Sequence, residues 1–419
     1  MVIDRYLLSS RTHPGCTYRG YALAAIVTVA VVAGAEAQPH TQRAWQLALL
    51  ELDDGDTLHL PAGEYALTES LIADGYDDVV IQGAGRDRTI LRFAGQSSGA
   101  EGLKVSNCDR ITLRDFAVFD TAGDAIKVQN CHGITFANLE TSWTGEPSET
   151  NGSYGLYPVQ CSDVLIEGCR ARGASDAGIY VGQSERVVVR DCEAVGNVAG
   201  IEIENTTDAE VYANRAVGNT GGILVFDLPG LLKKAGGRVL VRDNEIRDNG
   251  LRNFAPAGNI VAQVPPGTGV MVLATSDVTV RDNDISGHKT TSVAVVSYHV
   301  TELPIDDPAY DPIPTGVVVR DNRISRERTW PALRPRIGKL LALKYGRRVP
   351  PILYDGITAT ALAGEADVGA WGLCVSGNDA DLAFLDAARD FDALARNPAG
   401  FDCADGVAEA RPAPPHTVR

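Results

Sequence analysis

The sequence lacks the excess of basic residues that a nucleic-acid-binding surface needs. It has 38 lysine and arginine residues against 54 aspartate and glutamate residues, and its formal net charge at pH 7 is −16. Nucleic acids are bound by dense basic surfaces that neutralise their phosphates. The composition therefore argues against nucleic acid as a partner, whereas an acidic polysaccharide remains compatible with it.

Cysteine motifs that would indicate a metal or redox site are also missing. None of the eight cysteines belongs to a Cys-x-x-Cys or Cys-x-x-Cys-His motif, so the sequence gives no support to a zinc ribbon, a thioredoxin-type centre or covalently bound haem. The histidines His132, His288 and His299 are scattered without the spacing of metal ligands. We therefore expect no transition-metal centre.

The apolar run near the N-terminus is too short for a membrane-spanning helix. It covers Tyr21–Gly34, follows Arg11 and Arg19, and is followed by the small residues of an Ala-Glu-Ala sequence at 35–37. A spanning helix needs roughly 20 apolar residues. The pattern instead predicts a cleaved signal peptide over residues 1–37. We expect an exported protein, periplasmic or extracellular, with no membrane span after cleavage.

What the sequence does contain is a repeat of about 22 or 23 residues, clearest between Gly155 and Asn205. Each copy starts with an aliphatic residue, and a second apolar residue follows two positions later, as in a strand with one buried face. A second strand begins eight residues after each start, and a third short strand follows. The starting residues are Leu103, Ile126, Leu156, Ile179, Ile201, Ile223, Val270 and Val293. A period in this range is typical of a solenoid.

Small and amide side chains recur at the turns of this repeat. One set comprises Cys108, Cys131, Cys161, Ser184, Thr206 and Thr275, and the other comprises Cys169, Cys192, Asn214, Asn244, Asn283 and Asn322. Stacked side chains of this kind hydrogen-bond to the next copy and satisfy buried turn backbone. Five cysteines are thereby explained as buried ladder residues. Cys374 and Cys403 lie outside the ladder, and we predict a disulfide between them.

The repeat also defines the expected domain organisation. Helical spacing of apolar residues predicts an N-terminal cap helix within residues 38–55, because an open solenoid end exposes strand edges and core. Residues 56–328 form the solenoid, with insertions near 141–153, 228–237 and 251–267, and residues 329–419 form a C-terminal cap. Insertions in solenoids emerge as loops, often on the binding face.

Three short strands per coil, glycine before the inward residue and an asparagine ladder together resemble the right-handed parallel β-helix proteins of the pectin-lyase-like superfamily. Segments such as YGLYPVQCSDVLIEGC and SDAGIYVGQS are similar to an exported bacterial group of parallel β-helix repeat proteins. The resemblance implies an all-β, single-stranded, right-handed parallel β-helix. It also implies a polysaccharide lyase, glycoside hydrolase, esterase or epimerase. Tyr154–Gln160 resembles part of a mannuronan epimerase motif, but Tyr157, Val159 and Gln160 replace its acidic and histidine positions.

The outward positions of the first strand predict a track of sugar-binding size. Neighbouring coils lie about 4.8 Å apart, so equivalent residues form rows. One row is Lys104, Lys127, Tyr157, Tyr180 and Glu202, with Glu204 beside it; Gln160, Gln183, Asn205 and Asp227 lie close by, and Asp124 and Asp176 sit in the preceding turns. Aromatic faces suit sugar rings, while amides and carboxylates suit hydroxyls.

The candidate catalytic residues are Lys127, Tyr157, Tyr180 and Glu202. Lys127 or Tyr157 would remove the proton beside a uronate carboxylate, while Ca²⁺ would neutralise that carboxylate. The candidate calcium ligands are Asp176, Glu202, Glu204 and Asp227. The candidate substrate-binding residues are Gln160, Gln183, Asn205 and Asp227. Hydrolysis would need a carboxylate pair, such as Glu202 with Asp176 or Asp227.

The sequence thus predicts an exported protein that binds or processes an acidic polysaccharide or envelope glycan, by lyase or epimerase chemistry, along the outer strand face. The alternative is a non-catalytic envelope scaffold that binds a partner through its insertion loops. Solvent-facing strand positions are polar in inert solenoids as well, so the row alone does not decide between the two.

Overall fold

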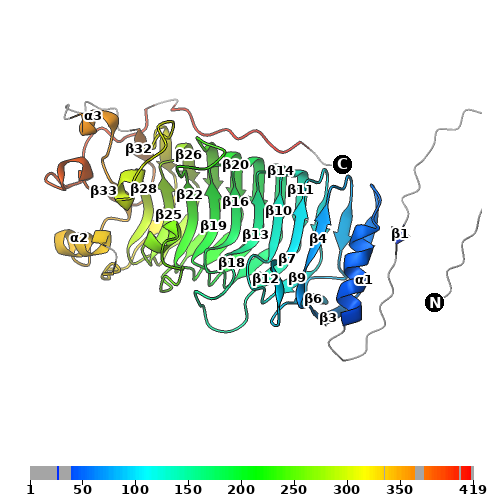
Figure 1. Cartoon of the computed structure of the whole chain (residues 1–419). Coiled ribbons are helices and arrows are strands. Elements are labelled where there is room, and N and C mark those ends of the chain that lie inside the picture. The colour runs from blue at the N-terminus through cyan, green and yellow to red at the C-terminus, as the bar shows by residue number, and fades with distance from the viewer. Residues whose placement is uncertain (1–25, 28–38, 335, 364–371, 405–406, 417–419) are drawn as a thin grey trace, which may run out of the picture.

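The computed structural model describes residues 26–27, 39–334, 336–363, 372–404 and 407–416. Its strands stack into a long solenoid with three sheets, seen from the side in Figure 1. Strands of successive coils pair in parallel and in register, which confirms the predicted parallel β-helix. The predicted signal peptide lies outside the described residues, except for the two residues of β1 (Ile26–Val27).

The three sheets are here called A, B and C. Sheet A contains β1, β2 (Thr57–His59), β5 (Val80–Gln82), β8 (Thr112–Arg114), β11 (His132–Ala137), β14 (Ser162–Glu167), β17 (Glu185–Arg190), β20 (Thr207–Tyr212), β23 (Gly237–Arg242), β26 (Ser276–Arg281), β29 (Val317–Arg320) and β32 (Leu373–Ser376). Sheet B contains β3 (Gly63–Ala66), β6 (Thr89–Arg92), β9 (Ala117–Phe119), β12 (Glu140–Ser142), β15 (Arg170–Arg172), β18 (Glu193–Val195), β21 (Arg215–Val217), β24 (Glu245–Arg247), β27 (Asp284–Ser286) and β30 (Arg323–Ser325).

Sheet C carries the predicted row from Lys104 to Glu202. It contains β4 (Glu69–Asp74), β7 (Ser98–Ser106), β10 (Ile126–Gln129), β13 (Tyr154–Val159), β16 (Ala177–Gly182), β19 (Ala199–Glu204), β22 (Gly221–Phe226), β25 (Thr268–Leu273), β28 (Thr291–Val296), β31 (Ile352–Tyr354), β33 (Leu382–Phe384) and β34 (Ala395–Arg396). The eight aliphatic starting residues of the repeat are all buried inside the solenoid. Burying one such side chain contributes about 1.5–3 kcal/mol, so the repeated core drives the stacking.

A helix closes the N-terminal end of the solenoid, in accordance with the predicted cap. This helix, α1 (Pro39–Leu50), lies across the first coils (Figure 1). Its Trp45 and Leu49 side chains are buried in the core. The Gln46 side chain donates to the backbone oxygen of Ile72 and accepts from its amide, both at 2.9 Å. An amide side chain therefore pairs with the polar backbone of β4, which would otherwise be an open strand edge.

At the C-terminal end, sheets A and C extend beyond residue 328, where we expected the solenoid to stop. They gain β31, β32 and β33, and this part also contains α2 (Arg336–Tyr345), α3 (Ala359–Leu362) and η3 (Ala387–Arg389). The predicted disulfide between Cys374 and Cys403 is confirmed. No helix in the described parts of the chain is long and apolar enough to cross a membrane.

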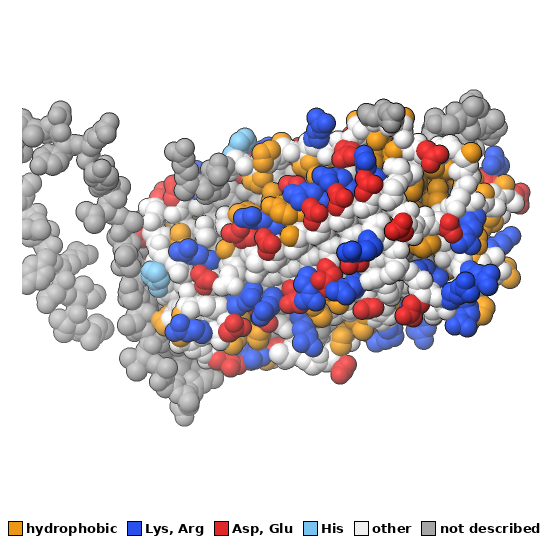
Figure 2. Space-filling model, turned by 180° about the vertical axis from the view of Figure 1, so that it is seen from behind, with side chains coloured by type: hydrophobic (Ala, Val, Ile, Leu, Met, Phe, Trp, Pro, Cys, Tyr) orange, Lys and Arg blue, Asp and Glu red, His pale blue; other side chains and the backbone are white. Residues whose placement is uncertain are grey.

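The predicted asparagine ladder runs through the turns between sheets A and B. The Asn244 side chain donates to Asn283 at 3.0 Å and accepts from the Asn214 amide at 3.0 Å, and Asn378 adds a further member beyond Asn322. The five ladder cysteines are buried and free, as predicted. A second ladder of Asn197, Asn219 and Asn249 ends at the ring of His288. On the face opposite to Figure 1, acidic and basic side chains are interleaved (Figure 2).

Candidate functional site

The register of sheet C assembles the predicted row of outward residues. Lys104 and Lys127 are paired partners on β7 and β10, and Lys127 is paired with Tyr157 on β13. Tyr180 on β16 is in turn paired with Glu202 on β19. The parallel register therefore places a cation, two phenols and a carboxylate in one line, as the repeat predicted.

The expectation that this whole row faces solvent is wrong for its second half. Tyr180 is 4 % exposed and Glu202 is 1 % exposed. Two segments that contain η1 (Ile260–Gln263) and η2 (Tyr298–Thr301) cover this part of sheet C. Their apolar residues form a second hydrophobic cluster with the sheet, outside the solenoid, whose members include Leu224, Phe226, Phe254, Val261, Val264 and Tyr310. The outward residues Leu224 and Phe226 are apolar, so β22 offers a hydrophobic surface. The two segments pack on this part of sheet C because that contact removes apolar area from water.

Three carboxyl groups are buried beneath this cover. Glu204 Oε1 accepts a hydrogen bond from the Tyr180 hydroxyl at 2.6 Å. Asp176 Oδ2 accepts one at 2.9 Å from the side-chain amide of Asn259, which belongs to the covering segment. Glu202 Oε2 has no hydrogen-bond partner among the described residues. A carboxylate without a partner is costly to bury, so this arrangement favours protonated carboxyl groups.

Burial raises the pKa of all three carboxyl groups. Burial first, and neighbouring carboxylates with it, raise the pKa of Asp176 and of Glu204 to about 7 each, although their hydrogen bonds from Asn259 and Tyr180 oppose the change. Burial, followed by the charges of Asp176 and Glu204, raises the pKa of Glu202 well above its usual range. The three groups thus share protons near neutral pH, because three adjacent negative charges would repel one another.

The predicted calcium site is not formed. In the described part of the chain, no three histidine, cysteine, aspartate or glutamate side chains come together in a way that could hold a metal ion. Asp176 and Glu204 are turned toward Asn259 and Tyr180, and Asp227 Oδ1 accepts from the Gly236 amide at 3.3 Å. Because these carboxyl groups are each directed to a protein donor, their oxygens do not converge as hard cations require.

Most of the predicted substrate-binding amides hold a loop instead of facing an open surface. Gln183 Oε1 accepts from the Leu232 and Lys233 amides at 3.1 and 3.3 Å. Asn205 accepts from the Leu228 amide at 2.8 Å and donates to the Leu228 and Lys233 oxygens. These contacts fix the insertion after β22 to the solenoid. Gln160 stays partly exposed and accepts from the Gln129 side chain at 3.2 Å.

The first half of the row is partly exposed and combines groups of different chemistry. Lys127 Nζ lies 4.0 Å from Glu101 Oε1 and 4.9 Å from the centre of the Tyr157 ring. The rings of Tyr154, Tyr157 and Tyr180 contact one another with centroid distances of 4.4 to 5.0 Å. This open end of sheet C, centred on Lys127 and Tyr157, is the candidate site.

Sequence reasoning placed Asp124 near the row but gave it no role, and it overlooked Glu101 and Tyr154. All three lie two residues before an inward start, Glu101 and Tyr154 on β7 and β13 and Asp124 in the turn before β10, so they occupy equivalent places in successive coils. Burial raises the pKa of Asp124 to about 6, although Lys127 opposes this. Burial and nearby carboxylates, Asp124 first, raise the pKa of Tyr157 to about 12. Tyr157 is therefore a proton donor at neutral pH, and Asp124 is better suited to be the base.

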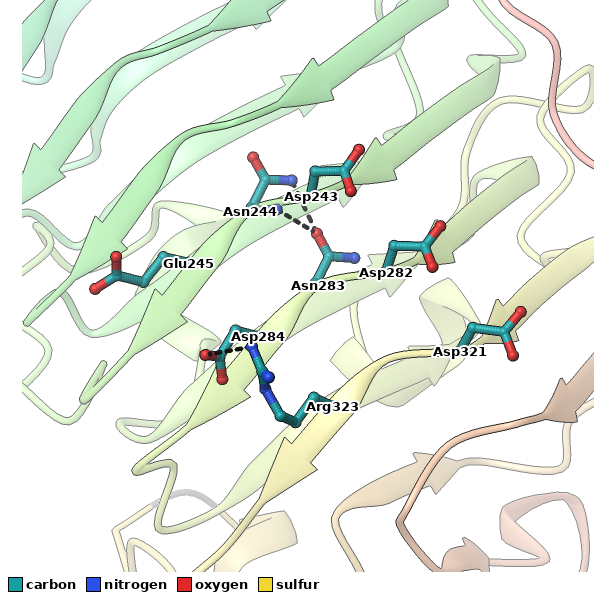
Figure 3. Close-up of a pocket in the computed structure, with 8 residues that line it drawn as sticks. All are labelled: Asp243, Asn244, Glu245, Asp282, Asn283, Asp284, Asp321 and Arg323. Atoms are coloured by element: carbon teal, nitrogen blue, oxygen red, sulfur yellow. Dashed lines mark hydrogen bonds and ion pairs between the residues drawn. The ribbon is translucent and has the colours of Figure 1, made fainter.

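A hollow of about 450 Å³ lies elsewhere, at the turns between sheets A and B (Figure 3). It is lined by Asp243, Asn244, Glu245, Asp282, Asn283, Asp284, Asp321 and Arg323. The acidic residues there are matched by arginines, as in the 3.1 Å pair of Asp284 with Arg323, and the asparagines belong to the ladder. The hollow is therefore a structural corner whose charges are compensated by ion pairs.

Comparison with known proteins agrees with the fold. Residues 101–233 match the family model of the right-handed β-helix region. The A-module of mannuronan C-5 epimerase AlgE6 from Azotobacter vinelandii is 16 % identical, with a TM-score of 0.47, over 82 % of this chain and 92 % of that chain. The C387A mutant of DFA-IIIase from Arthrobacter chlorophenolicus A6, in complex with DFA-III, is 14 % identical, with a TM-score of 0.48, over 75 % of this chain and 86 % of that chain.

The fold and the family match together confirm the resemblance to right-handed parallel β-helix proteins. No curated protein matches the chain. The solved structures are too distant in sequence and in superposition to say anything about the reaction or the ligand of this chain.

Proposed function

We propose that this protein processes an acidic polysaccharide at the open end of sheet C, by proton abstraction beside a uronate carboxylate. The observation that carries the proposal is the meeting of a half-buried carboxylate, a lysine and a proton-bearing phenol at Asp124, Lys127 and Tyr157. Stacked tyrosine rings border them, and such faces suit pyranose rings.

The chemistry requires a base, a positive charge and an acid. Asp124, whose pKa is raised to about 6, is ionised at neutral pH yet basic enough to accept the proton. Lys127 would pair with the substrate carboxylate as negative charge builds on it, in place of a metal ion. Tyr157 keeps its proton and would give it to the leaving oxygen in an elimination, or to the opposite face of the sugar in an epimerisation.

Hydrolysis by the buried carboxyl groups is disfavoured by their cover. A glycosidase needs two carboxyl groups on either side of the bond that breaks. Glu202, Asp176 and Asp227 are instead buried beneath or beside segments that pack on the sheet.

We propose an export location, periplasmic or extracellular, on the N-terminal sequence alone.

The test is to incubate the purified mature protein with polymers of mannuronate, guluronate and galacturonate, with and without Ca²⁺. Unsaturated sugar ends are followed by ultraviolet absorbance and epimers by nuclear magnetic resonance. We expect Asp124→Asn and Tyr157→Phe to lower kcat by about 10²–10⁴, as expected for general acid–base groups. Lys127→Met should raise KM as well as lower kcat.

The matched control is Lys104→Met, which removes the same charge in the same row, two coils away from Tyr157 and one coil away from Lys127. It should retain nearly all activity. Absence of turnover and of glycan retention on any polymer would contradict the proposal and favour the non-catalytic scaffold. Turnover that is unchanged in Asp124→Asn and Tyr157→Phe would place the reaction at another site.

A further inference from the structure

The end of the chain forms a strap along the outer face of sheet A. Residues 407–416 run back from the C-terminal coils toward the N-terminal end, drawn in red in Figure 1. The base of this tail is fixed by the Cys374–Cys403 disulfide and by the Val375 amide, which donates to the Phe401 oxygen at 2.6 Å. Residues 407–416, here called the tail, therefore follow an anchored segment and contact sheet A at Glu409, Ala410, Ala413 and His416.

Three backbone amides of the tail donate to side chains of sheet A. The Ala410 amide donates to Thr279 Oγ1 at 2.8 Å, and the Ala413 amide donates to Asp208 Oδ1 at 3.1 Å. The His416 amide donates to Asp163 Oδ1 at 2.8 Å. The donors recur at every third residue of the tail. The acceptors lie on β26, β20 and β14, so that each is two coils from the next.

This spacing matches a polyproline II chain to the solenoid. Two coils span about 9.6 Å, because adjacent strands lie about 4.8 Å apart. Three residues of polyproline II, one full turn, span about 9.3 Å. The match is closest between Ala413 and His416, whose acceptors are equivalent positions on their strands. Thr279 lies further along its strand than these aspartates, so the tail enters the row at a slant.

The prolines of the tail fit the same spacing of one donating amide at every third residue. Pro412, Pro414 and Pro415 all lie between the donating positions, where no amide hydrogen is used. A proline at Ala413 would remove a donor, whereas proline at the other positions restricts the free chain toward the bound shape. The sequence of the tail is therefore fitted to this row of acceptors.

The surface beneath the tail is held ready for such a chain. Asp163 and Asp208 are each fixed by two hydrogen bonds from one arginine, Arg186 and Arg238 respectively. Leu240 and Val318 flank Thr279 in the outward row of sheet A, yet they are only 8 % and 2 % exposed. The surface thus offers oriented acceptors beside apolar side chains.

An ion-paired glutamate directly precedes the first donating amide of the tail. Glu409 contacts Arg320 at 2.9 Å and Arg281 at 3.4 Å, directly before the first donating residue, Ala410. This face thus accommodates one pattern, here called the frame: an acidic residue, then donating amides at every third position, with prolines between them. Neutral proline-rich segments without the acid would lose this contact.

We propose that the outer face of sheet A is a binding surface for extended proline-rich peptide segments of this frame, and that the chain's own tail is its built-in occupant. A segment of another protein with the same frame would replace the tail. The proposal does not depend on the reaction at sheet C, because it uses a different sheet and different residues.

The experiment uses the full chain with the substitutions Ala410→Pro and Ala413→Pro. These substitutions remove two donors of the tail and leave the residues of sheet A unchanged. A fluorescent synthetic peptide of residues 407–416 is then titrated and its anisotropy measured. We expect saturable binding to this variant and at least tenfold weaker binding to the natural chain, because the tethered tail competes at high effective concentration. Circular dichroism and thermal unfolding verify that the variant folds.

Two altered peptides and one substitution on sheet A test whether binding depends on this frame. A peptide with Ala413→Pro should lose binding, whereas a peptide with Pro414→Ala keeps every donor and should bind within a few-fold. Asp208→Asn, added to the chain variant, should weaken binding. Absence of binding to the folded variant, equal binding to the natural chain, or equal binding of the Ala413→Pro peptide would each overturn the proposal.

Discussion

The buried carboxyl groups under the cover of sheet C should make the stability of this protein fall between pH 5 and pH 8. The substitution that tests this is Glu204→Gln, which removes one ionisable group but keeps an oxygen that can accept from the Tyr180 hydroxyl. Glutamine has nearly the same shape, so the packing of the cover is preserved.

The magnitude follows from the pKa of Glu204, which burial raises from 4.5 to about 7. A group with a raised pKa in the folded state binds more protons there than in the unfolded state. Its contribution is fully present below about pH 4.5 and is lost as the pH rises through 7. One pH unit corresponds to about 1.4 kcal/mol, so the loss between pH 5 and pH 8 is about 2–3 kcal/mol. The glutamine variant should escape this loss.

The assay is thermal unfolding followed by circular dichroism at pH 5 and at pH 8. The gain in Tm of Glu204→Gln over the natural protein should be larger at pH 8 by about 4–6 °C, since 1 kcal/mol moves the Tm of a large domain by roughly 2 °C. The control is Glu193→Gln, which removes a surface partner of Arg215 and should act equally at both pH values. An equal effect of Glu204→Gln at both pH values would refute the reasoning.

Three further predictions concern the ladder, the disulfide and the cover. Asn244→Ala strands the polar groups of Asn214 and Asn283 and should cost about 2–3 kcal/mol in urea unfolding, whereas Cys192→Ala should cost less. Cys374→Ser opens a loop with a sequence separation of 29 and should cost about 3 kcal/mol, with Cys403 then alkylated as a free thiol. Asn259→Ala removes the donor to Asp176 and should speed hydrogen exchange in residues 251–264 without changing that of β8.

The repeated parts of the fold could be predicted from the sequence because each coil meets a nearly identical neighbour. The inward residues, the row from Lys104 to Glu202 and the cysteine ladder all follow from one register. The second ladder was available to the same reasoning, because Asn197 and Asn219 have the same offset from Ile179 and Ile201.

The chemistry of the candidate site could not be predicted in the same way. Whether Tyr180 and Glu202 are buried depends on Phe254 and Tyr310, which lie in non-repeating segments far along the chain. Periodicity gives no information about where such segments pack. The roles of Tyr157 and Asp124 therefore emerge only when burial, and with it the pKa of each group, is known.

The strap also changes how the molecule is expected to come apart. Coils of a solenoid contact only their neighbours, so such arrays can unravel from one end. The tail joins β29 and β26 directly to β20 and β14, so these coils gain a long-range connection. Under a pulling force at the C-terminal end, the strap must detach before the coils beneath it can peel away one at a time. Coils before β14 have no such contact with the described tail, so the mechanical resistance of the solenoid should be unequal along its axis.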